Sequence, residues 1–307
     1  MKSHIIILLY IAVACVSGEI NRHEYPITSD VYIQSKVHVM HDDHQNPILS
    51  AVYNQSKVHV KQDGRHQQEY YGYEPLCPDA EDIFPCVCTY HSEDNAMDLH
   101  CFYVESEEQL KQIFKANFPF KNFREIAIHD SNNIKVLEAG VFNDISFEII
   151  YLPFNSLEVV ELHALDSCYE TATVISLENN AITSFPFDEL SQFSHLNIFN
   201  IGYNSMSMIP ADAFHGLTAL EYLFMSGNYA NIIGTFQDLP NLRSIHLYSN
   251  DLTTIPAQFI ETGSSNLSYI GLDYNNIVSV EPAAFDIIDG LVIDMWHNSL
   301  STLEEAT

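Results

Sequence analysis

The segment LNIFNIGYNSM, residues 196–206, decides the fold of this chain. Counted from Leu196, apolar residues stand at positions 1, 4, 6 and 11, and an asparagine stands at position 9. The same frame recurs, and its asparagines follow one another at intervals of 25, 24, 24, 22, 25 and 23 residues. These position-9 residues are Asn155, Asn180, Asn204, Asn228, Asn250, Asn275 and Asn298. An imperfect copy that begins at Phe123 precedes them, so the chain holds about eight copies of one unit.

A unit of this length with the pattern L-x-x-L-x-L-x-x-N-x-L is typical of leucine-rich repeats. Positions 4 and 6 point inward from a short strand, and each strand pairs in parallel with its copies. The amide of the position-9 asparagine can donate to and accept from backbone groups that would otherwise be buried without partners. The sequence therefore predicts an α/β solenoid over residues 121–307, a leucine-rich-repeat horseshoe with a parallel inner sheet and an asparagine ladder.

A second set of residues recurs later in the units. Four phenylalanines fall 18 to 20 positions into their copies, where we expect them to stack as an apolar spine under the convex side. They are Phe142, Phe214, Phe259 and Phe285. Because each unit cannot bury its apolar face alone, stability comes from the neighbouring units, and the ends need caps.

Residues 1–18 have the features of a secretory signal peptide. Lys2 supplies the positive charge, Ile5–Val16 is an apolar run, and small residues precede Glu19. The apolar run is too short to span a membrane as a helix. The sequence therefore predicts a secreted, extracellular protein.

Residues 19–76 differ from the repeats. They are polar and rich in His and Tyr, and the segment Val31–Val39 is nearly repeated at Val52–Val60. Such a segment buries too little apolar surface to offset its ordering entropy, so we expect a flexible, disordered extension. Its histidines could bind zinc or copper, or they could belong to a plain spacer; we assign no metal. Asn54 begins a glycosylation sequon, Asn-Gln-Ser.

Residues 77–120 contain four cysteines, Cys77, Cys86, Cys88 and Cys101, and we expect them to form an N-terminal cap. Behind a signal peptide the residue type favours disulfides, and four cysteines allow three pairings. A zinc site that uses Cys86 and Cys88 is the alternative. Within the same segment, residues 106–118 predict a helix, because Ser106 with Gln109 fits a capping box and Leu110, Ile113, Phe114 and Phe118 share one face.

The cysteine spacing, the segment Glu108–Phe114 and the segment Phe147–Leu165 resemble a family of secreted arthropod leucine-rich-repeat proteins. These are similar to the non-catalytic subunit of Oplophorus-luciferin 2-monooxygenase, and the resemblance covers about residues 75–307. In such caps the first cysteine bonds the third and the second bonds the fourth, which implies Cys77–Cys88 and Cys86–Cys101. The founding subunit accompanies a separate catalytic chain, so the resemblance implies a secreted, non-enzymatic, partner-binding role.

The charge of the chain limits its partners. Lys and Arg number 12 against 41 Asp and Glu, which gives a net charge of −29. Residues 136–307 hold 22 carboxylates and a single base, Arg243. Such a surface repels nucleic acid and anionic membranes and favours basic proteins or divalent cations. We expect a secreted protein partner that is basic or aromatic-recognising. The alternative is that the acidity only keeps a secreted protein soluble.

No G-x-S-x-G, H-E-x-x-H, G-x-G-x-x-G or P-loop motif occurs in the sequence. We therefore assign no catalytic residue and no cofactor, and we expect a secreted non-enzymatic protein-binding module, the scaffold or stabilising partner of another secreted protein. The alternatives are a structural protein of the extracellular matrix and a recognition protein of the innate-immune type.

The inner strands carry the candidate site. Positions 2, 3, 5, 7 and 8 of each unit face away from the core, and aromatic residues flanked by carboxylates at these positions are typical of protein-binding surfaces. The alternative is that the position-8 aromatics only cover the edge of the ladder. Arg243, at the rim, is either a partner contact or a charge-balancing residue. The candidate partner-binding residues are Tyr222, Phe224, His246, Tyr248, Tyr269, Tyr274 and Trp296.

Three further features stay open on sequence alone. Asn266 begins a second sequon, Asn-Leu-Ser, beside an inward leucine. Cys168 is unpaired by the cap pattern, so it is a buried free thiol, an intermolecular disulfide or part of an unrecognised internal bridge. No cysteine-rich cap follows the last repeat, so either the sequence is incomplete or a partner, or Glu304 and Glu305, shields that end.

Overall fold

The computed structural model describes residues 77–303, apart from 94, 232, 262 and 286–287, together with the backbone of Ile6–Leu8. The chain divides into two units, residues 1–12 with 74–307 and residues 13–73. The second unit lies outside the described residues, and with it the predicted cleavage site, the tandem duplication and Asn54. The first unit is the solenoid.

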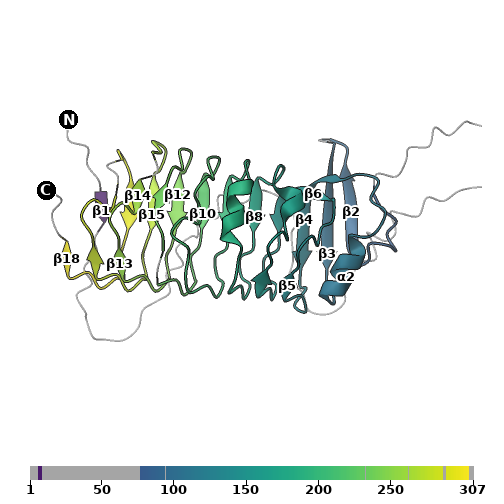
Figure 1. Cartoon of the computed structure of the whole chain (residues 1–307), viewed down its shortest axis with the longest axis horizontal. Coiled ribbons are helices and arrows are strands. Elements are labelled where there is room, and N and C mark those ends of the chain that lie inside the picture. Colours follow the sequence, from purple (N-terminus) through teal and green to yellow (C-terminus); the bar gives the residue numbers. More distant parts are fainter. Residues whose placement is uncertain are drawn as a thin grey trace, which may run out of the picture. The chain divides into compact units, whose positions relative to one another are not determined.

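The solenoid is built on one long sheet (Figure 1) with the order β1-β17-β15-β12-β10-β9-β8-β6-β4-β3-β2. Eight of its strands carry repeat positions 3 to 5 and pair in parallel with their neighbours. They are β4 (Asn122–His129), β6 (Ser146–Tyr151), β8 (Val174–Ser176), β9 (Ile198–Asn200), β10 (Tyr222–Phe224), β12 (Ser244–His246), β15 (Tyr269–Gly271) and β17 (Val292–Asp294). The predicted parallel sheet of about eight repeat strands is confirmed.

The last repeat departs from the predicted frame at position 1 alone. The frame places Gly290 at position 1, but Gly290 is exposed with φ of +81°, and Leu291 is fully buried in its place. Beyond this repeat, β1 (Ile6–Leu8) pairs in parallel with β17. Because β1 lies within the predicted signal peptide, cleavage after Gly18 would leave β17 at the edge of the sheet.

The cap closes the other end of the sheet. Strands β2 (Cys86–His91) and β3 (Ala96–Phe102) form an antiparallel hairpin, and β3 pairs in parallel with β4. Disulfides join Cys77 to Cys88 and Cys86 to Cys101. The pairing implied by the resemblance is therefore confirmed, and the alternative of a zinc site at these cysteines is wrong.

Helix α2 (Glu107–Ile113) follows the hairpin and is shorter than the predicted span. Its start matches the capping signal, since the Gln109 amide donates to Ser106 Oγ at 3.2 Å. The Gln109 side chain accepts from the Glu105 amide at 2.6 Å, one residue before the expected partner. The chain leaves the helix after Ile113, yet Phe118 is still buried against the first repeat.

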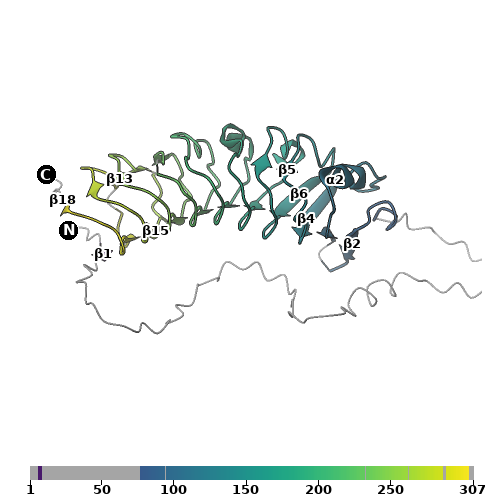
Figure 2. The same cartoon turned by 90° about the horizontal axis from the view of Figure 1, so that it is seen from below.

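The convex side carries short strands and 3-10 helices, as Figure 2 shows for β5 and β13 opposite β4, β6 and β15. In the described part of the chain the one α-helix belongs to the cap. The convex side of the repeats is therefore formed by short strands and 3-10 helices rather than by α-helices. These segments are β5 (Val136–Leu137), β7 (Val159–Val160), η1 (Asp166–Cys168), η2 (Phe187–Gln192), β11 (Phe236–Gln237), β13 (Thr254–Ile255), β14 (Ile260–Glu261), β16 (Ser279–Val280) and β18 (Thr302–Leu303).

Phenylalanine rings form the predicted spine inside these loops. Phe214 stacks on Phe236 with ring centroids 5.6 Å apart, and Phe236 contacts Phe259 at 5.3 Å. Phe259 in turn contacts Phe285 at 6.0 Å. The sequence frame did not include Phe236, which joins two members of the spine. Phe142 packs instead on the cap through Phe114, at 4.9 Å.

The asparagine ladder is complete over its seven predicted members. Asn204 represents them: its Oδ1 accepts from the amide of Ile182 at 2.9 Å, and its Nδ2 donates to the carbonyl of Leu177 at 2.9 Å. Asn155, Asn180, Asn228, Asn250, Asn275 and Asn298 make the same pair of bonds to the preceding repeat. In the imperfect first copy Ser131 takes this place, and its Oγ accepts from the Val104 amide at 2.9 Å.

Cys168 is a free thiol, fully buried in η1. Burial raises the pKa of the thiol to about 11. A thiol that is neutral and shielded from solvent at pH 7 reacts slowly. The structure therefore favours the buried free thiol over both disulfide alternatives for Cys168.

The ladder yields the first prediction. Asn204→Leu should destabilise the fold by about 3 kcal/mol, because it leaves a buried amide and buried carbonyls without partners. Denaturant unfolding of the purified protein measures the loss. Asn231→Leu is the matched control, since Asn231 is exposed and outside the ladder. Equal midpoints for the two variants would count against the ladder as a source of stability.

The cysteines yield the second prediction. A non-reducing peptide map should recover Cys77 with Cys88 and Cys86 with Cys101, and an alkylating reagent should label Cys168 only after denaturation. Rapid labelling of Cys168 in the native protein would contradict its buried state.

Candidate functional site

The candidate surface is the face of the long sheet that is turned away from the core. In each short strand the middle residue is buried and its neighbours are partly exposed, as in Tyr222-Leu223-Phe224 of β10. Because side chains alternate across a strand, positions 3, 5 and 7 of every repeat share this face. In the last four repeats, six of the twelve residues at these positions have aromatic rings, with His246 counted among them.

An aromatic row crosses three adjacent strands. Phe224 of β10 stacks on His246 of β12 with ring centroids 4.7 Å apart and an interplanar angle of 22°. His246 contacts Tyr269 of β15 at 5.1 Å. The register pairs Phe224 with His246, whereas Tyr269 pairs with Ser244 and its ring reaches His246 from the adjacent strand. All three residues lie on strands of the sheet, so the row needs no loop to form. We refer to Phe224, His246 and Tyr269 as the aromatic row.

A glycine explains why Tyr269 joins this row. The register places Gly271, and not Tyr269, beside His246. A Cβ on Gly271 would lie 2.9 Å from Tyr269 Oη and 3.1 Å from its Cε1. The missing side chain thus leaves the space over which the Tyr269 ring lies.

The same device occurs at Gly227. A Cβ there would lie 2.5 Å from Cδ1 of Tyr203, so the Tyr203 ring covers this glycine. Tyr203 then reaches past the intervening repeat, and its hydroxyl lies 3.2 Å from that of Tyr248. Gly227 therefore lets the Tyr203 ring extend over the next repeat, whereas Gly271 leaves room for the Tyr269 ring over its own strand.

A second aromatic group stands beyond the row, toward the end of the sheet. Tyr274 contacts Trp296 at 5.0 Å and stacks on His297 at 4.4 Å, and Trp296 contacts His297 at 4.4 Å. His297 was not among the candidates, although its place directly before a ladder asparagine could have marked it. We refer to Tyr274, Trp296 and His297 as the end group.

Tyr222 does not share these contacts. Ser244 of β12 pairs with Tyr222 of β10 on one side and with Tyr269 of β15 on the other. Ser244 therefore separates the two tyrosines. Among the described residues, the ring contacts of Tyr269 run to His246 and not to Tyr222. Tyr222 and Tyr269 thus lie on the same face with Ser244 between them, and Tyr222 stands apart from the ring contacts of the aromatic row.

Burial keeps the row uncharged. It lowers the pKa of His246 to about 4, so this imidazole is neutral at pH 7. Burial raises the pKa of Tyr269 to about 12, with the carboxylates of Asp294 and Asp273 adding to the effect. Burial likewise raises the pKa of Tyr248. The row therefore presents neutral rings with polar tips, which suits a protein interface.

Two carboxylates stand between the row and the end group. Asp273 is 9% exposed, and burial together with the charge of Asp294 raises its pKa to about 6. Asp294 accepts from the backbone amide of Trp296 at 3.4 Å. The sequence holds no Lys or Arg after Arg243. The last two repeats therefore supply no Lys or Arg side chain to neutralise this pair, and His297 is the basic side chain that acts on Asp273.

Arg243 is engaged elsewhere. Its Nε lies 2.6 Å from Oε2 of Glu221, which occupies the same position in the preceding repeat. This pair favours the interpretation of Arg243 as a charge-balancing residue at the rim of the sheet.

The cap end of the same sheet contrasts with the aromatic end. Asp98, which is buried, accepts from Arg124 Nε at 2.9 Å and Nη2 at 2.5 Å, and His91 Nε2 lies 2.7 Å from it. Nearby, His100 Nε2 lies 3.6 Å from Glu125 Oε1. Charges at this end are compensated within the chain.

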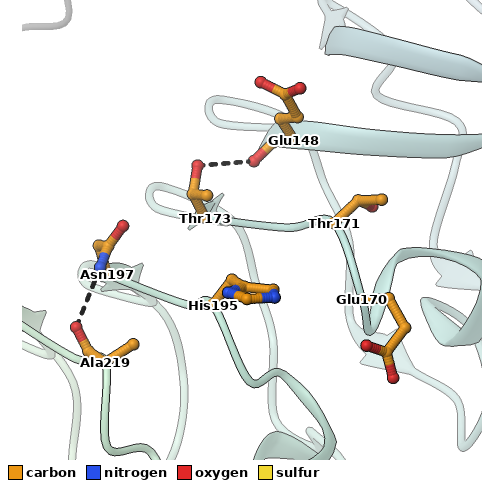
Figure 3. A pocket seen from close by; sticks show the side chains of 7 residues that line it. All are labelled: Glu148, Glu170, Thr171, Thr173, His195, Asn197 and Ala219. Atoms are coloured by element: carbon orange, nitrogen blue, oxygen red, sulfur yellow. Dashed lines mark hydrogen bonds between the residues drawn. The ribbon is translucent and has the colours of Figure 1, made fainter.

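A shallow polar hollow lies where the loops enter β6, β8 and β9 (Figure 3). Its lining is Glu148, Glu170, Thr171, Thr173, His195, Asn197 and Ala219. Thr173 donates to the carbonyl of Glu148 at 3.1 Å, and Asn197 donates to that of Ala219 at 3.0 Å, so these side chains link neighbouring repeats (Figure 3). The hollow contains no nucleophile held by a base, and we assign it no chemistry.

Metal-ligand clusters and membrane-spanning helices are two further features that would indicate a function. Within the residues that the structure describes, no three His, Cys, Asp or Glu side chains gather as metal ligands. In the same residues no helix is long and apolar enough to cross a membrane. The predicted glycan acceptor Asn266 is exposed, and its modification stays a prediction.

The buried carboxylate yields the third prediction. A pKa raised from 3.8 to about 6 on folding means that the folded protein binds a proton more tightly than the unfolded chain. The contribution of the Asp273 carboxyl group to the stability of the folded protein is present below pH 4 and is lost as the pH rises through 6. Asp273→Asn should therefore stabilise the protein at pH 7.5 by roughly 3 kcal/mol, at 1.36 kcal/mol per pKa unit.

Thermal unfolding at pH 7.5 and at pH 4 measures this effect, and the gain should vanish at pH 4. Asp251→Asn is the control, because Asp251 is exposed and outside the pair. A destabilised Asp273→Asn variant at pH 7.5 would show that the carboxylate is compensated in a way the structure does not contain.

Comparisons with known proteins agree with this architecture. The leucine-rich-repeat family model matches residues 170–229. The chain is 32% identical over 213 residues to the Oplophorus-luciferin 2-monooxygenase non-catalytic subunit of Oplophorus gracilirostris. The aligned region covers 69% of this chain and 58% of that protein. The chain is 30% identical over 204 residues to podocan of Mus musculus, covering 62% and 32%. The chain thus spans less than two thirds of either relative.

A solved structure, the TLR13–ssRNA13 complex, matches with a TM-score of 0.56 at 23% identity, over 67% of this chain and 29% of that one. At this identity the likeness shows the fold alone. The chain therefore has the leucine-rich-repeat fold, and its sequence is similar to the non-catalytic subunit of Oplophorus-luciferin 2-monooxygenase.

Proposed function

We propose that this chain is a secreted, non-enzymatic protein-binding module, and that its partner docks on the aromatic row and the end group. The observation that carries the proposal is the aromatic surface itself. Rings from five consecutive repeats lie in contact or within hydrogen-bond distance on a face that the core does not use. Tyr and Trp contribute large contact area at low entropic cost, and they are enriched where protein interfaces gain most of their energy.

The position of the rings argues against a purely internal role. Tyr203 and Tyr274 remain 44% and 48% exposed, although they contact other rings. A ring that only covered the ladder's edge would gain nothing from lying across a glycine toward the next repeat. The rigid sheet also holds the surface in one conformation, which lowers the entropic cost of binding.

The relative's name supports the class of function. The Oplophorus protein is called a non-catalytic subunit, which describes a chain that works beside another. We carry over that role alone, as scaffold or stabilising partner of another secreted protein, and not light emission. Secretion is supported by the predicted signal peptide and by the two disulfides of the cap, since disulfides persist in oxidising compartments.

The fourth prediction tests the surface. The double substitution Phe224→Ala and Tyr269→Ala should weaken binding of the native partner by about 2 kcal/mol or more, roughly thirtyfold, because it removes both ends of the row. The partner is the protein that co-purifies from the native secretion, and affinity is then measured on the purified pair. Tyr222→Ala, on the same face but outside the row, should have a smaller effect.

Tyr229→Ala is the matched control, because Tyr229 is 61% exposed and lies outside the aromatic row and the end group. Gly271→Ala is a second test, since its Cβ would displace the far end of Tyr269 without removing the ring. Unchanged affinity in the double variant would contradict the proposal. Self-association of the parent through this face, with no other protein bound, would indicate a structural protein instead.

A further inference from the structure

We propose that Asp273 and Asp294, with the rings of Tyr248, Tyr269 and Trp296 around them, form the seat of an arginine side chain that the protein partner inserts into the inner face. This inference rests on the proposed function, because it names the chemistry of the partner at the same surface. We refer to these five residues as the arginine seat.

The register brings the seat together. Gly271 pairs with Asp294, so the strand geometry places Asp273 and Trp296, each two residues further on, side by side on the same face. The amide of Tyr274 donates to the Trp296 carbonyl at 3.1 Å, which continues that pairing past the strands. The amide of Ser249 donates to the Asp273 carbonyl at 3.0 Å, so Tyr248 stands on the other side of Asp273. Asp273 thus lies between two rings.

The two remaining members come from the neighbouring position. Tyr269 lies over Gly271, the residue that pairs with Asp294, and both carboxylates act on its hydroxyl. The three strands that carry the seat, β12, β15 and β17, are adjacent in the sheet. The seat is therefore continuous with the aromatic row through Tyr269 and with the end group through Trp296.

The charges in and around the seat are not balanced within the described chain. Asp273 is about nine-tenths buried, and no Lys or Arg side chain among the described residues pairs with it. His246 is neutral at pH 7, which leaves His297 as the nearby group that can carry positive charge. An ionised carboxylate in this position destabilises the folded protein. Retaining such a group against its cost is typical of functional sites.

Arginine fits this arrangement better than other cations. Its guanidinium is planar and always charged, presents a fork of donors to carboxylates, and stacks on aromatic faces. A lysine ammonium would meet the charge but would not stack between rings. A site with two carboxylates and three rings therefore matches arginine in charge and in shape, and the acidity of the repeats would attract a basic partner from a distance.

The single tryptophan of the chain provides the test, because Trp296 is part of the seat. The full secreted chain is titrated with a capped peptide of alternating Arg and Gly residues at physiological salt, and Trp emission is recorded. Matched peptides replace arginine by lysine or by citrulline, which keeps the shape and removes the charge. We expect saturable binding of the arginine peptide, at least fivefold weaker binding of the lysine peptide and none of the citrulline peptide.

Asp273→Asn and Asp294→Asn should each raise the Kd of the arginine peptide at least tenfold. Glu148→Gln is the control for general charge, since Glu148 is exposed and lies on β6, far along the sheet. Asp273→Asn is predicted to be more stable than the parent at this pH, so a loss of binding cannot be attributed to unfolding.

Three results would overturn the arginine seat: equal binding of the citrulline peptide, an unchanged Kd in both Asp variants, or an equal loss in Glu148→Gln. If the Asp variants bind the native partner normally while Phe224→Ala with Tyr269→Ala does not, the seat is wrong and the proposed surface stands. If the native partner ignores both sets of changes, the proposed function itself is wrong.

Discussion

The structure depends on the hydrogen bonding of one amide per repeat. At the end of each inner strand the chain bends, and the bend leaves backbone groups inside the solenoid where water cannot reach them. Asn204 satisfies the amide of Ile182 and the carbonyls of Leu177, Ile201 and Gly202 with one side chain. Because each amide bonds the preceding repeat, the same interaction sets the spacing of the strands.

The ladder also shapes the surface. The residue before each ladder asparagine has positive φ in all seven repeats, although only Gly227 among them is a glycine. These residues are Phe154, Asn179, Tyr203, Gly227, Ser249, Tyr274 and His297. A left-handed residue costs about 1 kcal/mol or more in a non-glycine, and the ladder holds it there. As a result, Tyr203, Tyr274 and His297 stand at a fixed place on the rim, where they extend the aromatic surface.

The two ends of the inner face have different electrostatics. At the cap, the carboxylate of Asp98 is neutralised by Arg124 and His91, so this end contributes to stability. At the other end, Asp273 has no Lys or Arg counterion among the described residues, and burial together with the charge of Asp294 raises its pKa. The first arrangement is neutralised within the chain, whereas the arginine seat proposed above would be neutralised by a cation from the partner. This difference, together with the rings, distinguishes a binding surface from a structural one.

The sequence predicts the repeat frame, the eight strands, the ladder and the cap, because each follows from a local pattern that recurs or from a spacing of cysteines. It also predicts which residues share the inner face. It does not predict which rings touch. Tyr222 and Tyr269 occupy equivalent positions, and both pair with Ser244, yet only Tyr269 joins His246. The residue two positions after Tyr269 is Gly271, which leaves room for the ring, whereas the residue two positions after Tyr222 is Phe224. Ser131 and Leu291 likewise take ladder and core places that the frame does not assign to them.

Hydroxyl-radical footprinting of the complex with its native partner tests the central claim most directly, because it reports the solvent exposure of individual rings without any substitution. The account predicts that Tyr203, Phe224, Tyr269 and Trp296 become protected on binding, while Tyr229 is oxidised equally in the free and bound states. Protection confined to Tyr229 and the convex side, with the inner-face rings unchanged, would contradict it.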